Sequence, residues 1–180
     1  RAEEGHFRQV ERLALKLFDL LKPLHGLGKR ERSWLQCASI LHDIGWIEGG
    51  TGHHKTALRL IQESPVLGCF SSRERRIIGS IARYHRGSLP REAHHPFGAL
   101  PEADRYTVCV LASLLRLADG MDSSHGSVVR EIRLRMEPGR ILLGCRVSSP
   151  AFWERESTEK KKDLFERTFR KELKIEWSQA

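Results

Sequence analysis

The spacing of apolar residues changes once along this chain, near residue 127, and this change limits the folds that the chain can adopt. Before it, apolar residues recur at intervals of three and four, the period of an α-helix with one buried face. After it, apolar residues alternate with arginines over 132–136, and beyond Pro138-Gly139 apolar residues again stand at every second position from 141 to 147. Alternation on both sides of a turn is typical of a β-hairpin. The sequence therefore predicts a mainly α fold with a small β-containing part at its end.

The boundary between the two patterns also suggests how the chain is divided. We expect a helical domain over residues 1–126 and a small ββαβ subdomain over residues 127–180. In the second part, a helix that begins near Ser149-Pro150 should reach about Arg170, and the last strand should follow it.

Capping signals give the expected bounds of the helices in the first part. Pro23 should end the first helix, and Ser33 with Gln36 should begin the second. Ser71 with Glu74 is a second capping-box pattern, and Pro101 stands where a first-turn proline belongs. The expected helices cover about residues 6–21, 33–42, 54–63, 71–85 and 102–118, with a loop over 90–101.

Composition limits the partners and the compartment. The net charge is +8, from 31 Lys and Arg against 23 Asp and Glu, and the excess is spread over both parts, which is compatible with nucleic acid, polyphosphate or nucleotide phosphates. No apolar run approaches the roughly 18–20 residues of a membrane helix, and no signal-peptide pattern opens the chain. The four cysteines are single and widely spaced, which predicts reduced thiols and a cytoplasmic protein. Because the chain begins at Arg1, we expect a fragment of a longer protein.

The central motif is the pair His42-Asp43, at the end of a helix that is apolar nearly all round. A carboxylate at the end of a buried helix is costly unless it is paired or coordinated. For an isolated pair, a core histidine beside a helix C-terminus would be the better interpretation. Here, however, other histidines and an aspartate also occupy inner faces or ends of helices.

These residues together suggest a metal site. Six imidazole and carboxylate ligands would hold two divalent ions, with open positions for water and a phosphate oxygen. The cofactor expected is Mg, Mn, Fe or Zn, and a purely structural set of histidines remains the alternative. The proposed ligands are His6, His42, Asp43, His54, His85 and Asp119.

Other charged residues stand close to these ligands in the sequence. Lys55, Arg83, Arg86 and Arg116 could receive phosphate oxygens, although a solvated surface charge is the better interpretation for any single one. Asp122 and His125 are expected to contact the ligands and orient them without binding the metal ion themselves. The run Lys160–Lys162 is expected to be a solvated helix face.

The order of His6, His42-Asp43 and Asp119 along the chain resembles the signature of the HD superfamily of metal-dependent phosphohydrolases. Several segments look more specifically like the C-terminal region of the exopolyphosphatase/guanosine pentaphosphate phosphatase (Ppx/GppA) family. These segments are residues 6–14, 24–27, 38–45, 53–55, 83–86, 114–122, 124–125 and 161–166.

The resemblance implies an HD-type helical bundle and phosphoanhydride hydrolysis, with Asp43 as the catalytic residue that would bridge the two ions. It also implies that the main active site lies on N-terminal actin-like domains, whose Gly-rich phosphate loop and parallel strand pattern this sequence lacks. The expected partners are polyphosphate or guanosine pentaphosphate, those N-terminal domains, and a second copy in a homodimer; no membrane or nucleic acid is expected. The alternative function is a basic binding and dimerisation module with a vestigial, catalytically silent metal site.

Overall fold

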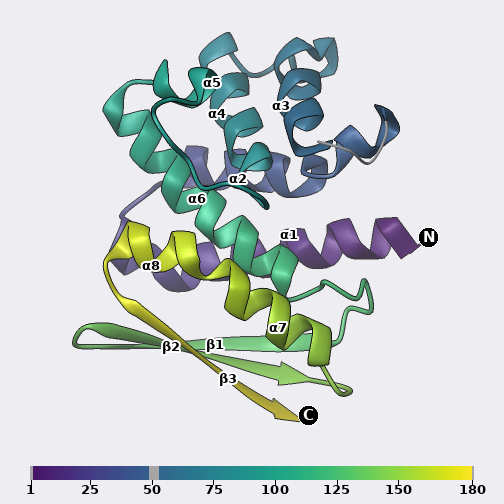
Figure 1. The fold of residues 1–180 in the computed structure, drawn as a ribbon, viewed down its shortest axis with the longest axis vertical. Coiled ribbons are helices and arrows are strands. Elements are labelled where there is room, and N and C mark those ends of the chain that lie inside the picture. The colour runs from purple at the N-terminus through teal and green to yellow at the C-terminus, as the bar shows by residue number, and fades with distance from the viewer. Residues whose placement is uncertain (1, 49–52, 180) are drawn as a thin grey trace.

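The computed structural model describes residues 2–48 and 53–179 and shows a mainly α fold with one small sheet (Figure 1). The glycine-rich turn expected at residues 49–52 lies outside the described residues. None of the described helices is both long enough and apolar enough to cross a membrane.

The helix α6 is the centre of the fold. It contacts α1, α2 and α4 on one side and α7 and α8 on the other. Every residue of α6 from Val110 to Gly120 is buried, including Arg116 and Asp119. Before the sheet, the elements are α1 (Ala2–His25), α2 (Lys29–Leu41), the 3-10 helix η1 (Ile44–Glu48), α3 (His53–Glu63), the 3-10 helix η2 (Pro65–Leu67), α4 (Ser72–Arg83), α5 (His95–Gly98) and α6 (Glu102–Gly120).

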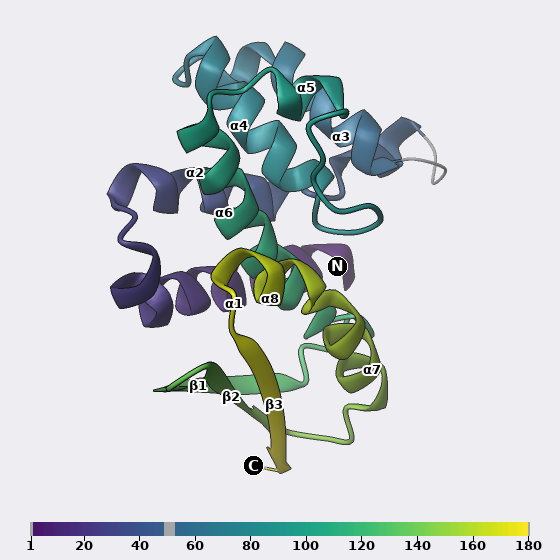
Figure 2. The ribbon, with the colours of Figure 1, turned by 60° about the vertical axis from the view of Figure 1, so that its left-hand side comes forward.

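The predicted hairpin is present as β1 (Val129–Glu137) and β2 (Arg140–Val147), which pair antiparallel. The third strand, β3 (Glu172–Gln179), lies beside β2 and runs parallel to it. The connection passes through α7 (Phe152–Lys161) and α8 (Asp163–Phe169), which lie between α6 and the sheet (Figure 2). The apolar residues of the inner sheet face join the same core cluster as the helices.

Two predicted helix boundaries were wrong. Pro23 does not end α1, which continues to His25; the chain leaves the helix at Gly26, whose φ of +67° favours glycine. A proline in the last turn is tolerated here because both Pro23 and Asp19, whose carbonyl loses its partner, are exposed. The second helix begins at Lys29 rather than Ser33, since Glu31 Oε2 accepts a hydrogen bond from Gly28 N at 2.8 Å.

The capping box at the start of α4 is confirmed, and it also joins two helices. Glu74 Oε2 accepts a hydrogen bond from Ser71 N at 2.9 Å, while Ser71 Oγ accepts one from Glu74 N at 3.3 Å. The other oxygen of Glu74 accepts hydrogen bonds from Arg30 Nε at 3.0 Å and Trp34 Nε1 at 3.2 Å, both on α2. This network sets the position of α4, which ends just before His85.

The expected single helix up to Arg170 is two helices. Asp163 begins the second of them: its Oδ1 accepts a hydrogen bond from Leu164 N at 2.7 Å, and both carboxylate oxygens also accept from Arg116. The expected loop over 90–101 likewise contains the one-turn helix α5, because Phe97 and Leu100 are buried in the core.

Candidate metal centre

Five of the predicted ligands come together where four helices end or begin. His6 lies in the second turn of α1, His42 and Asp43 follow α2, His85 follows α4, and Asp119 is in the last turn of α6. The three histidines are each at most 1% exposed, and His6, His42 and Asp43 offer ligand atoms that all lie within 4.8 Å of one another. A compact His-His-Asp cluster of this kind could hold a metal ion.

The two carboxylates both lie close to the same two imidazole nitrogens. Asp43 Oδ2 lies 3.5 Å from His42 Nε2 and 3.9 Å from His6 Nε2. Asp119 Oδ1 lies 3.5 Å from His6 Nε2 and 3.8 Å from His42 Nε2. On the remaining side, Asp43 Oδ1 lies 3.4 Å from His85 Nε2.

The other nitrogen of each imidazole has an acceptor that fixes the ring. His42 Nδ1 donates to Ser39 O at 2.7 Å and His85 Nδ1 donates to Ala82 O at 2.6 Å. His6 Nδ1 lies 2.8 Å from Oδ2 of Asp122, which is fully buried. Because carbonyl and carboxylate oxygens only accept, each Nδ1 carries a proton, and Nε2 is the nitrogen that each ring presents to the cluster.

The Nε2 atoms of His6 and His42 lie near carboxylate oxygens but make no hydrogen bond with them. Within residues 2–48 and 53–179, His6 Nε2 and His42 Nε2 have no hydrogen-bond partner, although both are buried. A buried polar atom without a partner costs about 1–3 kcal/mol. A cation between these nitrogens and the two carboxylates would satisfy all of them, so the residues present fit a metal ion.

The pKa values of His6 and His42 reflect their burial and the charged groups around them. Burial would lower the pKa of His6, but hydrogen bonding to Asp119 and Asp122 outweighs it and raises the pKa to about 9. Burial, followed by the charge of His85, lowers the pKa of His42 to about 4. His42 is therefore a neutral ligand at neutral pH, whereas His6 holds a proton that a metal ion would displace.

Both carboxylates remain ionised in spite of their burial. Burial would raise the pKa of Asp43, but the hydrogen bond with His85 and the charge of His42 hold it well below its usual range. Burial would also raise the pKa of Asp119, but the charge of Lys161 and the hydrogen bond with His6 bring it well below the usual value.

Lys161, the last residue of α7, is a site residue that the sequence analysis missed. Its Nζ contacts Asp119 Oδ2, and its side chain is 20% exposed, so the expectation of a solvated face was wrong for this lysine. The sequence gives no signal for this contact, because Lys161 follows Glu154 and Thr158 at helical spacing and the burial of these polar residues depends on how α7 packs on α6.

His125 and Asp122 both contact the ring of His6, as expected of residues that orient a ligand. The ring of His125 stacks on that of His6, with 3.8 Å between centroids and 9° between planes. Asp122 is held in turn by Ser127 N, which donates to its Oδ1 at 2.7 Å.

The sixth predicted ligand, His54, lies beside the cluster rather than within its compact group. It is half-buried in the first turn of α3, and its Nε2 is 3.7 Å from the position that a Cβ on Gly87 would take. Gly87 is two residues beyond His85, so His54 faces the loop that carries this ligand.

The four predicted phosphate-binding cations have different surroundings. Lys55 and Arg86 are exposed, whereas Arg83 lies over the ring of Tyr84, 5.4 Å from its centroid. Arg116 is 4% exposed and donates to Tyr84 O at 3.2 Å and Gly87 O at 3.3 Å. The contacts of Arg116 thus hold the loop around His85, and a role in binding phosphate stays a prediction for all four.

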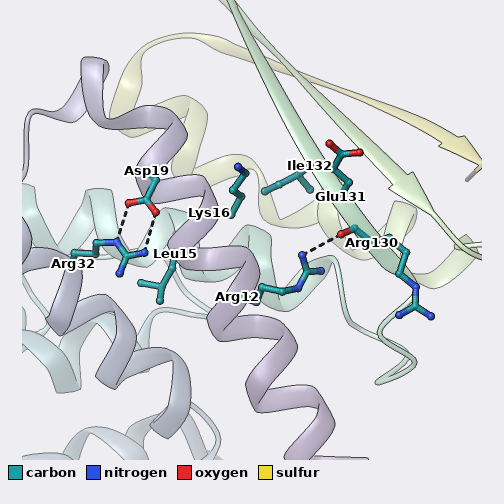
Figure 3. Close-up of a pocket in the computed structure, with 8 residues that line it drawn as sticks. All are labelled: Arg12, Leu15, Lys16, Asp19, Arg32, Arg130, Glu131 and Ile132. Carbon is teal, nitrogen blue, oxygen red and sulfur yellow. Dashed lines mark hydrogen bonds and ion pairs between the residues drawn. The ribbon is translucent and has the colours of Figure 1, made fainter.

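A separate groove lies between α1 and β1 (Figure 3). Arg32 binds both carboxylate oxygens of Asp19, at 2.8 and 2.9 Å, and Arg12 donates to Arg130 O at 3.1 Å. These contacts attach α1 to α2 and β1. The described residues that line the groove are Arg12, Leu15, Lys16, Asp19, Arg32, Arg130, Glu131 and Ile132, and none of them is a predicted site residue.

The cluster lies within the part of the chain that resembles known proteins. A family model described as Ppx/GppA phosphatase, domain III, matches residues 3–139. The chain belongs to the Ppx/GppA phosphatase family. The matched range includes all five clustered ligands and Asp122, whereas α7 with Lys161 lies beyond it. A comparison with curated proteins found no match to the chain.

Proposed function

We propose that this chain is the C-terminal, HD-type domain of an exopolyphosphatase/guanosine pentaphosphate phosphatase, and that it binds a divalent metal ion which helps to hold or hydrolyse a phosphate-rich substrate. One observation carries the proposal. Two buried Nε2 atoms, on His6 and His42, have no hydrogen-bond partner among the described residues and face two ionised carboxylates.

The chain's own residues would hold the ion in a defined way. His6, His42, Asp43 and Asp119 supply the ligand atoms, with His85 on the outer side of Asp43. Imidazole with carboxylate suits Zn²⁺, Mn²⁺ or Fe²⁺, whereas Mg²⁺ prefers oxygen ligands. A bound ion would polarise a phosphoryl oxygen and acidify a coordinated water. Asp122 and the carbonyl of Ser39 keep the imidazole lone pairs directed at that position.

The substrate class follows from the family and from charge. Polyphosphate and guanosine pentaphosphate are both strongly anionic, and the chain has a net charge of +8 with exposed Lys55 and Arg86 near the cluster in sequence. The actin-like N-terminal domains of the same enzyme would be the partner that carries the main active site. The four free cysteines support a cytoplasmic location, and the exposed pair Phe152 and Trp153 supports the expected homodimer.

A second candidate is the binding and dimerisation module with a catalytically silent centre. The contact between Lys161 and Asp119 favours it, because an ammonium group already takes one oxygen of a proposed ligand. Under this alternative the chain would bind polyphosphate without releasing phosphate.

The test is metal analysis of the purified chain with hydrolysis assays on polyphosphate and guanosine pentaphosphate. Asp43→Ala should abolish metal uptake and leave the circular dichroism spectrum unchanged. His95→Ala, at an exposed histidine, is the matched control and should bind metal as the wild type does. Metal binding with phosphate release would establish an enzyme, and metal binding without release would favour the silent module. A wild-type chain that takes up no metal would contradict the proposal.

A further inference from the structure

We propose that Lys161 binds a phosphate oxygen of the substrate beside the metal ion. This role rests on the metal centre proposed above, and it assigns to that centre a residue that would touch the substrate. Lys161 lies beyond residues 3–139, the range that the family model matches.

Lys161 lies on the side from which a ligand can reach the centre. The three histidines of the centre are each at most 1% exposed, whereas the side chains of Asp43 and Asp119 are 14% and 13% exposed. The side chain of Lys161 is 20% exposed, more than either carboxylate. A substrate would therefore meet the centre where Lys161 and the carboxylates reach solvent.

The ammonium group of Lys161 has donors to spare. Its Nζ contacts Oδ2 of Asp119, whose other oxygen lies 3.5 Å from His6 Nε2. Among residues 2–48 and 53–179, Nζ has no second hydrogen-bond or ion-pair partner. A lysine has three N–H donors, so two remain for a ligand. The contact with Asp119 thus keeps a partly free cation at the edge of the cluster, next to the position where an ion would bind.

Charge favours an anion at this position. One divalent ion would balance the two carboxylates, Asp43 and Asp119, while Asp122 is engaged by Nδ1 of His6. Lys161 adds a further positive charge, and the ion and the ammonium group would repel each other across Asp119. A phosphate that accepts hydrogen bonds from Lys161 and contacts the ion would remove this repulsion.

The fold holds Lys161 in this position. Gly120 allows α7 to approach α6 closely, since a Cβ there would stand 3.0 Å from Cα of Thr158. Lys161 follows Thr158 by one helical turn, so the same close approach directs its side chain to Asp119.

The experiment measures metal binding and phosphate binding separately and does not depend on activity. The probes are Mn²⁺ and methylphosphonate, which carries one phosphoryl group and is not hydrolysed. Broadening of the phosphorus NMR line by bound Mn²⁺ gives the affinity for methylphosphonate, and competition with a chelating dye gives the affinity for Mn²⁺.

We expect Lys161→Met to change the two affinities in opposite directions. Its affinity for methylphosphonate should fall about 10- to 100-fold, the effect of losing one hydrogen bond between charged groups. Its affinity for Mn²⁺ should rise about 10-fold, because a positive charge beside the ion is removed. Lys161→Arg keeps the charge and should retain most of the affinity for methylphosphonate. Lys160→Met is the matched control and should behave as the wild type, because Lys160 has a 71% exposed side chain that pairs with Glu156.

The outcomes separate the role of Lys161 from the proposed function. A wild-type chain that binds no Mn²⁺ would overturn both. If the wild type binds Mn²⁺ but no methylphosphonate, or if Lys161→Met binds methylphosphonate as tightly as the wild type, only the role of Lys161 is overturned. A parallel loss of both affinities would show that Lys161 only holds the centre together, and would also overturn this role. If Lys161→Met does not fold, Lys161→Gln removes the same charge from a polar side chain and should give the same two changes.

Discussion

His6 Nδ1 lies 2.8 Å from Oδ2 of Asp122, which is 116 residues later in the chain, and this contact determines which nitrogen of His6 faces the metal centre. Asp122 can only accept a hydrogen bond from the ring, so Nδ1 carries the proton. The other oxygen of Asp122 accepts from Ser127 N at 2.7 Å, which fixes the carboxylate itself. Nε2 of His6 therefore faces the candidate centre, where a metal ion would replace its proton, because of a residue that would not touch the ion.

Asp122→Asn tests this relationship with almost no change in shape. The amide oxygen can still accept from Ser127 N, which places the NH₂ group against His6 Nδ1. Nδ1 must then accept, and the proton moves to Nε2, where it blocks the metal. We expect metal affinity to fall about 10- to 100-fold, measured by competition with a chromogenic chelator. Asp104→Asn is the control: Asp104 is a buried carboxylate paired with Arg73, and its change should leave metal affinity intact.

Metal binding should stabilise the protein, because its ligands come from α1, α6 and the segment after α2. At a free ion concentration of 100 times the dissociation constant, the expected gain is about 2.7 kcal/mol. For a chain of this size the midpoint of thermal unfolding should rise by about 5–10 °C. Differential scanning fluorimetry with and without Zn²⁺ or Mn²⁺ measures the shift. Asp43→Ala should show none, and an equal rise in this variant would place the ion elsewhere.

The pH dependence of stability should show the contribution of Glu74. Hydrogen bonds from Ser71 N and then Arg30 lower the pKa of this carboxyl from 4.5 to about 2. A depressed folded-state pKa stabilises the native state above the unfolded value, and this contribution is lost as the pH falls through the folded one.

We therefore predict that the free energy of unfolding differs between the wild type and Glu74→Gln by an amount that depends on pH. Above pH 4.5 the variant should have a lower free energy of unfolding by about 1–2 kcal/mol, the usual cost of a lost helix cap. The difference should shrink between pH 4.5 and about 2, as urea unfolding at several pH values would show. A difference that does not change with pH would mean that the charge of Glu74 is not what stabilises α4.

Sequence patterns located much of the candidate centre because helix geometry is periodic. His6, His42 and His85 lie on inner faces or at helix ends, and the same spacing that buries Val10 and Ile81 brings them inward. Asp119 was found in the same way, one turn beyond Leu115. Local spacing therefore predicts which side chains point to the core.

Spacing does not predict contacts that depend on how helices pack. Lys161 belongs to a run of three lysines on a polar helix, and only the packing of α7 on α6 brings it to Asp119. The end of α1 was misplaced for a related reason, since the exposure of Pro23 decides whether a lost hydrogen bond matters. Asp163, at the start of α8, pairs with Arg116, which is 47 residues earlier in the chain and so lies beyond the reach of local spacing. The division of the chain at residue 126 stays a prediction.

The contact between α6 and α7 gives the last prediction. A Cβ on Gly120 would stand 3.0 Å from Cα and 3.1 Å from N of Thr158, and backbone atoms cannot move aside as a flexible side chain can. Gly120→Ala should therefore push α7 away and lower the free energy of unfolding by about 1–3 kcal/mol.

Gly5→Ala is the matched control, because Gly5 is in α1 and a Cβ there would have nothing within 4 Å. This change should instead stabilise the protein by about 0.5–1 kcal/mol, since alanine restricts the unfolded chain and favours the helix. Urea unfolding of both variants measures the difference. Because Lys161 lies one turn beyond Thr158, Gly120→Ala should also weaken the contact of Lys161 with Asp119. A Gly120→Ala protein as stable as the wild type would show that α7 does not depend on this close approach.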